Sequence, residues 1–456
     1  MCGITACISQ NCVQILFNGL VQLQNRGYDS AGITSLDQNF ITTKFASDEE
    51  RALVNLERCK NEHLKSKIGI AHTRWATHGP KTDINSHPHI SYNGNFALVH
   101  NGIIENYKLL KQELKQNNIN CISETDSEII VNLIEFYYQS LSCMEALNKV
   151  LSLLEGTWSL VILCKNEPNT LYCTRKGSPL LIGEHNNIAI VASEQSAFCN
   201  RLINYIALNN QDICMISLEN EKINITTKES YTKIPVQNVS SELFLENYKY
   251  WTEKEIYEQT DSSLRAISFG VRLLPTGKVK LDGLESHLEQ LIGIDNIILL
   301  GCGTSYFAGL CGKSYLKYLC DFNTVQVIDG AELELNDIPN QGKTAFILLS
   351  QSGETKDLYR CLEMTKDLDI IKIGVVNVVD SLIAREMDCG CYLNAGREIG
   401  VASTKSFTSQ VIILSMIAIW FSQIKNINPS KRTSYIQDLR KLYLDIEQTM
   451  KNCDID

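Results

Sequence analysis

The second residue of the chain combines two groups that can act together in catalysis. The sequence begins MCGITAC, so removal of Met1 would leave Cys2 with both a thiol and a free α-amine. The amine titrates near ~7.7–8.0 and the thiol near ~8.5, so both change protonation close to neutral pH. A thiol beside its own base suits nucleophilic attack on a carbonyl. Taken alone, the position also fits a merely tolerated cysteine, so the hypothesis depends on the remaining sequence.

Four polar stretches in the first half of the chain could supply the partners of such a nucleophile. They are RGYDSAG (26–32), AHTRWATHG (71–79), HNGIIEN (100–106) and SETDSE (123–128). Arg74 can bind a carboxylate with its planar guanidinium group, and Asp126 can hold an ammonium group. The Asn101 amide and the Gly102 N–H can donate hydrogen bonds to an oxyanion. Glutamine carries the carboxylate, ammonium and amide groups that these residues would bind.

Together with MCGI, these stretches resemble the glutaminase domain of class II glutamine amidotransferases, which are N-terminal nucleophile hydrolases. The resemblance implies that Trp75 and Tyr28 control the passage of ammonia, although ordinary packing is the alternative for both rings. The residues to which it assigns catalysis or glutamine binding are Cys2, Arg74, Thr77, His78, Asn101, Gly102 and Asp126.

Loops rich in hydroxyl groups recur in the second half of the chain. GCGTS (301–305), LLSQSGET (348–355) and GVASTKSFT (400–408) each follow a predicted strand and open a predicted helix. Hydroxyl groups and the free N–H groups of a helix start bind a phosphate monoester well. GCGTS is also a weak dinucleotide fingerprint, but Tyr306 occupies the third glycine position and disfavours that interpretation. Simple helix capping is the other alternative.

These loops resemble those of sugar-isomerase (SIS) domains, and both halves together resemble the glutamine–fructose-6-phosphate amidotransferases. The resemblance implies L-glutamine and fructose 6-phosphate as substrates, glucosamine 6-phosphate as product, and no cofactor. Lys405 is expected to be a cation near the phosphate or a helix-start residue, because the family's Schiff-base lysine lies in a C-terminal tail. The candidate sugar-phosphate residues are Thr304, Ser305, Ser350, Gln351, Ser352, Thr355, Val401 and Ala402.

The pattern of apolar segments predicts two different folds in one chain. Residues 1–237 show short alternating strands with few helices, which predicts an α+β layered sandwich. The resemblance to N-terminal nucleophile hydrolases implies that its layers are ordered αββα. Residues 238–285 are expected to form a helical connector. Residues 286–425 alternate apolar strands with helices, which predicts a doubly wound parallel α/β sheet. Residues 426–456 are expected to form a helix leading toward a second SIS lobe that this chain lacks, so that synthesis would need a homodimer partner or a second chain.

Net charge, apolar segments and cysteine spacing disfavour several classes of binding partner and cellular location. The net charge of -10 disfavours nucleic acid and anionic membranes as main partners. No signal peptide is recognisable, and the most apolar stretch, 411–421, is shorter than the ~20 residues of a membrane span. We therefore expect a buried helix there and a cytoplasmic protein. The 17 cysteines form no C-x-x-C pairs. The HPH motif at 87–89 places two imidazoles close together, as a metal site could use, but too few thiols or carboxylates lie at ligand spacing and no metal site is predicted.

A second class of function is a regulatory protein that senses sugar phosphates and whose glutaminase is idle. It would share the loops and motifs described above. Measurable hydrolysis of glutamine distinguishes the enzyme from the sensor.

Overall fold

The computed structural model describes residues 2–24, 27–48, 50–75, 79–236, 245, 248–379 and 381–453. The chain divides into two compact units, Met1–Leu243 and Phe244–Asp456.

Two antiparallel sheets form the centre of the first unit. Among the described residues, one sheet has eight strands in the order β14-β11-β9-β10-β1-β4-β2-β3, and the other has six in the order β13-β12-β8-β7-β6-β5. The strands are β1 (Gly3–Ile8), β2 (Ser30–Leu36), β3 (Phe40–Ala46), β4 (Ile68–Arg74), β5 (His89–Ile90), β6 (Phe96–Ile104), β7 (Gly156–Cys164), β8 (Thr170–Lys176), β9 (Leu181–His185), β10 (Ile188–Ala192), β11 (Asn204–Ala207), β12 (Ile213–Glu219), β13 (Lys222–Thr226) and β14 (Ile234–Pro235).

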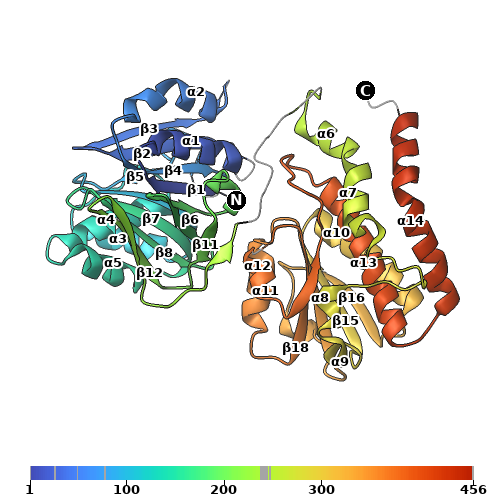
Figure 1. Ribbon diagram of the computed structural model, residues 1–456. Coiled ribbons are helices and arrows are strands. Elements are labelled where there is room, and N and C mark those ends of the chain that lie inside the picture. The colour runs from blue at the N-terminus through green and yellow to red at the C-terminus, as the bar shows by residue number, and fades with distance from the viewer. Residues whose placement is uncertain are drawn as a thin grey trace. The chain divides into compact units, whose positions relative to one another are not determined.

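Helices cover the outer face of each sheet. α1 and α2 lie over the eight-stranded sheet, while α3, α4 and α5 lie over the six-stranded sheet (Figure 1). A third core of apolar side chains, including Ile4, Val99 and Val161, fills the space between the two sheets. The predicted αββα sandwich is therefore confirmed. These helices are α1 (Cys12–Leu23), α2 (Ala52–Cys59), α3 (Tyr107–Gln116), α4 (Asp126–Tyr138) and α5 (Cys143–Leu151).

The register of the strands brings distant motifs to one end of the sandwich. β1 pairs with β4 in an antiparallel register that sets Gly3 opposite Thr73, so Cys2 lies level with the end of β4 at Arg74. In the other sheet, Asn101 lies on β6 opposite Ser159 of β7. The outer helix α4 begins at Asp126. Two sheets and one helix start thus meet near Cys2, directly before β1.

A five-stranded parallel sheet forms the centre of the second unit, in the order β16-β15-β17-β18-β19 among the described residues. The central strands β15 and β17 are buried along their whole length, as expected for parallel strands that are covered on both sides, whereas the edge strand β16 is only partly buried. The sheet order reverses direction between β15 and β17, where ligands bind in doubly wound folds. The strands are β15 (Asn296–Gly301), β16 (Thr324–Asp329), β17 (Thr344–Ser350), β18 (Ile370–Val376) and β19 (Cys389–Tyr392).

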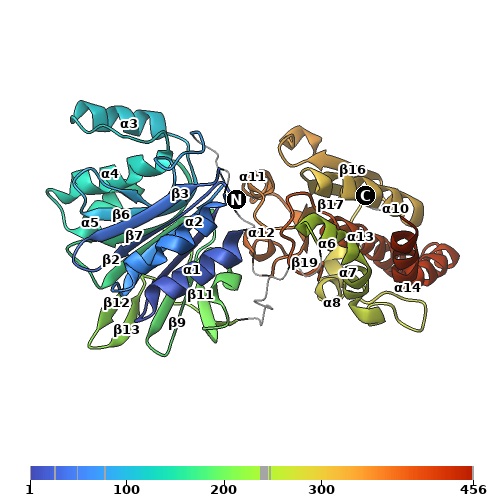
Figure 2. The same cartoon turned by 90° about the horizontal axis from the view of Figure 1, so that it is seen from above.

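Helices pack on both faces of this sheet, which confirms the predicted doubly wound fold. α11 and α12 cover one face, and α10 and α13 cover the other (Figure 2). The helices are α6 (Trp251–Tyr257), α7 (Gln259–Ala266), α8 (Asp282–Glu285), α9 (Leu288–Leu291), α10 (Thr304–Leu319), α11 (Lys356–Met364), α12 (Leu382–Arg385), α13 (Lys405–Ile424) and α14 (Pro429–Asn452).

Segments outside the expected 286–425 domain complete its core. Ala266 and Leu284, from the predicted connector, are buried in the same cluster as α13. Ile436 and Leu439 of α14 join that cluster, so the first half of this helix packs back onto its own unit. α13 is long and apolar enough to cross a membrane, but 72% of its most apolar window is buried inside the unit. It has the burial of a core helix, as the sequence predicts.

Candidate active site

The Cys2 thiol lies against the backbone at the end of β4. The Trp75 N–H donates to the Cys2 sulfur at 3.3 Å, and the thiol faces the Trp75 carbonyl oxygen at 3.6 Å. The sulfur is thereby held in place at the end of β4 by two contacts with the Trp75 backbone. Cys2 is half-buried, so a substrate can reach its sulfur. The position therefore suits a nucleophile better than a packed core cysteine.

Asn101 reaches across from the other sheet and contacts the same residue. Its Nδ2 donates to the Cys2 carbonyl oxygen at 3.0 Å. Its Oδ1 lies 3.0 Å from His72 Nε2, which is also 3.1 Å from the carbonyl oxygen of His100. Because a backbone carbonyl can only accept, His72 Nε2 must carry the proton. The amide oxygen of Asn101 is thereby held toward His72, and its N–H₂ group is turned toward Cys2, as an oxyanion-hole donor requires.

Gly102, the second expected oxyanion donor, has a backbone that no other residue could adopt at this place. Its φ is +143°, and a Cβ atom would lie 2.1 Å from the Thr157 carbonyl oxygen on the neighbouring strand. The strand β6 therefore needs glycine directly after Asn101. We conclude that the sequence HNG is explained by packing between β6 and β7 as well as by chemistry.

A buried cation and a buried anion stand beside these residues. Arg74 is 4% exposed, and burial lowers its pKa, while Cys2, Asp29 and Asp126 act in the opposite direction. Asp126 accepts the Ile104 N–H at 2.9 Å, and the Ser127 hydroxyl donates to its other oxygen at 3.3 Å. A charged pair of this kind can bind the carboxylate and ammonium groups of an amino acid.

The two aromatic rings expected to control ammonia do contact each other. Tyr28 and Trp75 form an edge-to-face pair with ring centroids 5.2 Å apart. Tyr28 is 46% exposed, so this ring is no buried core residue. Thr77 and His78, both expected at the glutamine site, lie outside the described residues.

A cluster of buried histidines packs beside the candidate active site. His72 stacks on His87 with centroids 4.1 Å apart, and His87 meets His89 edge to face at 4.7 Å. Burial lowers the pKa of His72 to about 3 and lowers the pKa of His87 and of His89 well below the ordinary value. His100 Nδ1 lies 2.9 Å from the Ser127 hydroxyl that bonds Asp126. The HPH motif is thus a neutral packed layer.

In the second unit, the loop after β17 is held by its own hydroxyl groups. Ser350 Oγ accepts the Gly353 N–H at 2.9 Å and lies 3.0 Å from Thr355 Oγ1. The Ser352 hydroxyl accepts the Glu354 N–H at 3.2 Å, and Gln351 is half-buried beside it. Gly353 has φ +67°, and a Cβ there would collide with Ser381. The loop is therefore a tight turn between β17 and α11, where N–H groups gather.

The other two loops differ in exposure. Thr304 opens α10 and is exposed, whereas Ser305 is buried and receives a hydrogen bond from Gln410 of α13 at 2.9 Å. Val401 is 70% exposed, and Ala402 is exposed beside it. Since β15 and β17 are neighbours at the point where the sheet order reverses, the first two loops share one edge of the sheet.

Buried charges fix the segment before α13. Lys405 is buried at the helix start and forms an ion pair with Glu258. Glu398 accepts the Thr404 N–H at 2.8 Å and the Ser406 N–H at 3.2 Å, and so caps the same helix. Glu255 accepts the Ile399 and Gly400 N–H groups. Lys405 is thus a helix-start residue, one of the two roles expected for it.

Three residues at the first site were not identified from the sequence. His72 lies inside a quoted motif, but its partner Asn101 is 29 residues away and in the other sheet. His100 and Ser127 hold Asp126 in place and directly adjoin two predicted site residues. In the sequence, His100 directly precedes Asn101 and Ser127 directly follows Asp126. Adjacency along the chain does not by itself show which side chains are in contact.

Comparison with known proteins agrees with this geometry in both units. Residues 72–200 match the glutamine amidotransferase domain family, and residues 290–420 match the SIS domain family. A probable glutamine–fructose-6-phosphate aminotransferase (isomerizing) of Acanthamoeba polyphaga mimivirus is 40% identical over 432 residues, which cover 92% of this chain and 69% of the relative.

The enzyme of that name from Caldanaerobacter subterraneus subsp. tengcongensis is 37% identical and covers 100% of this chain and 74% of the relative. Among solved structures, the C-terminal domain of glucosamine-fructose-6-phosphate aminotransferase from Francisella tularensis is 29% identical, with a TM-score of 0.41 over 44% of this chain and 56% of that chain. The family assignment rests on the identity and coverage of the two sequence relatives. The chain belongs to the glutamine–fructose-6-phosphate aminotransferase (isomerizing) family.

Proposed function

We propose that this chain takes the amide nitrogen of glutamine and provides it for the amination of fructose 6-phosphate to glucosamine 6-phosphate. The first unit would release ammonia from glutamine, and the second would bind the sugar phosphate. The observation that carries the proposal is the convergence of Cys2, Trp75 N–H and Asn101 at the end of the first sandwich, beside Arg74 and Asp126.

In the proposed first step, the Cys2 sulfur attacks the side-chain carbonyl carbon of glutamine. The free α-amine of Cys2, exposed after removal of Met1, takes the thiol proton and returns it to the departing ammonia. The second hydrogen of Asn101 Nδ2 and the Gly102 N–H stabilise the oxyanion. Water then attacks the thioester carbon, which releases glutamate and restores the thiol. Arg74 and Asp126 hold the α-carboxylate and the α-ammonium group of glutamine throughout.

In the second unit, we propose that the phosphate binds where the loops after β15 and β17 adjoin. Thr304, Ser352 and Thr355 offer hydroxyl groups at the starts of α10 and α11, where helix N–H groups favour an anion. Ser350 and Ser305 would hold the loops, because Ser350 accepts the Gly353 N–H and Ser305 accepts from Gln410 of α13. Gln351, Val401 and Ala402 would line the sugar. A cytoplasmic location, and a homodimer or a second chain at the sugar site, are further predictions.

The deciding experiment measures glutamate released from glutamine by purified protein. Cys2→Ala should lower the rate by at least roughly 10³-fold, as expected for loss of a nucleophile. Blocking the α-amine with a short N-terminal extension that is not removed should have an effect of similar size, because an amide nitrogen is no base. Cys121→Ala, which changes another half-buried thiol, is the matched control. Full activity of the extended protein, verified by mass, would refute the proposed base.

A further inference from the structure

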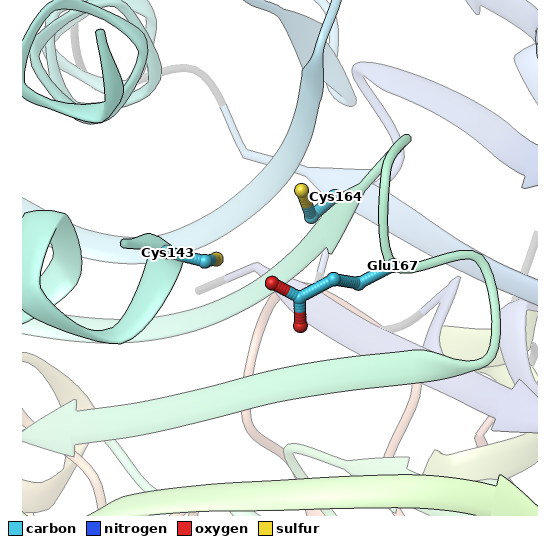
Figure 3. A group of neighbouring side chains, drawn as sticks. All are labelled: Cys143, Cys164 and Glu167. Carbon is cyan, nitrogen blue, oxygen red and sulfur yellow. The ribbon is translucent and has the colours of Figure 1, made fainter. Parts of the chain in front are cut away.

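A group of three potential metal ligands lies at the far end of the first unit. The Cys143 sulfur, the Cys164 sulfur and a Glu167 carboxylate oxygen all lie within 4.8 Å of one another. Among the described residues, this is the one group of potential metal ligands that lie so close together. Figure 3 shows them at the start of α5, the end of β7 and the turn that follows, with the Cys143 sulfur and the Glu167 carboxylate directed toward each other. Both thiols are buried and Glu167 is half-buried.

The spacing of these donor atoms is close to that of a tetrahedral site. With metal–ligand distances of about 2.0–2.3 Å, tetrahedral donors lie about 3.3–3.8 Å apart. The three donor atoms would therefore need to approach by about 1.5 Å at most. Two sulfurs with one carboxylate oxygen form a ligand set that favours zinc over magnesium or calcium, which bind oxygen alone.

The turn between β7 and β8 has the hydrogen bonds of a sulfur-binding loop. Glu167 follows Cys164 by three residues, and the Glu167 N–H closes the turn on the Cys164 carbonyl at 3.1 Å. The Cys143 thiol and the backbone N–H groups of Asn166 and Glu167 form hydrogen bonds to the Cys164 sulfur. N–H groups directed at a sulfur stabilise the negative charge that a metal-bound thiolate carries.

A buried phenol orients the carboxylate. Tyr172 of β8 is 3% exposed, and its hydroxyl donates to Glu167 Oε2. A hydrogen bond to the outer oxygen of a ligating carboxylate is a common support of metal sites. Cys143 itself is fixed by α5, whose first turn carries a complete capping box between Ser142 and Glu145. Each donor is thus held by a neighbouring group, as a preformed metal site requires.

The cluster is separate from the candidate catalytic site. Cys164 lies opposite Phe96 in the β6–β7 pair, five residues along the strand from the position opposite Asn101. At about 3.4 Å per residue this corresponds to roughly 17 Å. We propose that Cys143, Cys164 and Glu167 bind a zinc ion, with a water molecule as fourth ligand, and that the ion ties α5 to the β7–β8 turn.

The proposal is tested with the full chain, purified under reducing conditions and freed of metal by a chelator. Titration with Cd²⁺ should reveal one tight equivalent with the ultraviolet sulfur-to-cadmium charge-transfer band of two thiolates. Zn²⁺ should compete for it and should raise the melting temperature. Cys143→Ala and Cys164→Ala should each lose this equivalent. Glu167→Gln, which keeps the Tyr172 contact and the fold, should weaken binding about tenfold or more.

Cys173→Ala is the matched control, because Cys173 is equally buried and lies beside the Cys214 thiol across β8 and β12. It should keep the tight equivalent. The proposal is overturned if wild type and Cys143→Ala bind equal amounts of Cd²⁺, or if Glu167→Gln binds as wild type does. It is also overturned if peptide mapping of protein isolated without reductant finds a Cys143–Cys164 disulfide in place of the metal.

Discussion

The two candidate sites of this chain are built in opposite ways. In the first unit, Arg74, Asn101 and Asp126 are buried and lie on two sheets and a helix start. In the second unit, the candidate residues lie on loops at one edge of a single sheet, and several, such as Thr304 and Val401, are exposed. Attack on an amide requires donors that are fixed before the reaction begins, whereas binding of a phosphate requires hydroxyl and N–H groups gathered in one place.

The difference implies that single substitutions should act unequally on the two sites. A fixed donor cannot be replaced by its neighbours, whereas a loop with several hydroxyls can compensate for one of them.

Asn101→Ala should lower kcat for glutamate release by about 10²–10³-fold, because it removes an oxyanion donor that nothing else in the site replaces. The KM for glutamine should change little, since Arg74 and Asp126 remain. A coupled glutamate assay gives both constants. The melting-temperature shift caused by fructose 6-phosphate should be unchanged, because that ligand is assigned to the other unit. A variant with wild-type kcat would remove Asn101 from the mechanism.

Acid should destabilise the first unit more than the second. His72 has its pKa lowered to about 3 by burial, and the pKa of His87 and of His89 is also lowered by burial, while in the unfolded chain each titrates near ~6.5. Between these values the unfolded state binds more protons, so stability is complete above pH ~6.5 and is lost as the pH falls toward 3. Together, the three histidines should lower the free energy of unfolding by about 3 kcal/mol as the pH falls from 6.5 to 5.5.

Hydrogen exchange measured by mass spectrometry can follow the two units separately in one sample. Peptides from β4 and β6 should lose protection as the pH falls, after correction for the intrinsic exchange rate. Peptides from β15 and β17 serve as the internal control, because the sequence places only His287 beyond residue 250. Equal loss of protection in both units would show that the buried histidines do not govern acid stability.

His72 should act on catalysis through Asn101 alone. His72→Leu removes the donor that holds the amide oxygen, so the amide can rotate and kcat should fall about 10-fold or more, with little change in KM. His72→Gln can still donate to Asn101 Oδ1 and should recover most of the rate. His63→Leu is the matched control: this histidine is also buried, but it bonds Ser35 and Thr43 away from the site. Equal rates for the Leu and Gln variants would contradict a positioning role.

The sequence was informative where chemistry requires particular residues in short motifs. Cys2, Arg74, Asn101 and Asp126 lie in stretches with few alternative explanations, and the structure brings them together. The pattern of apolar residues predicts an α+β layered sandwich and a parallel sheet, whereas the αββα order of the layers came from the family resemblance.

Contacts made by the fold between distant segments were not predictable in this way. His72 meets Asn101 across two sheets, and Cys143 meets Cys164 only because α5 packs beside the end of β7. The direction in which α14 folds was likewise open, since an amphipathic helix shows that a face is buried and not what buries it. Such contacts depend on the register of strands and the packing of helices, which one sequence does not display.

The smallest effect is expected in the phosphate loops, and it tests the contrast most directly. Ser350 Oγ accepts the Gly353 N–H and bonds Thr355, so Ser350→Ala should loosen the turn after β17 without removing the hydroxyls of Thr304 and Ser352. Binding of fructose 6-phosphate should weaken only about tenfold, or ~1.4 kcal/mol. Calorimetry, or the shift in melting temperature, measures this change. Ser415→Ala is the matched control, because that buried hydroxyl bonds only its own helix, at Ile412. A complete loss of binding in Ser350→Ala would mean that the second site is as rigidly organised as the first, and that the contrast drawn here between fixed donors and compensating loops is wrong.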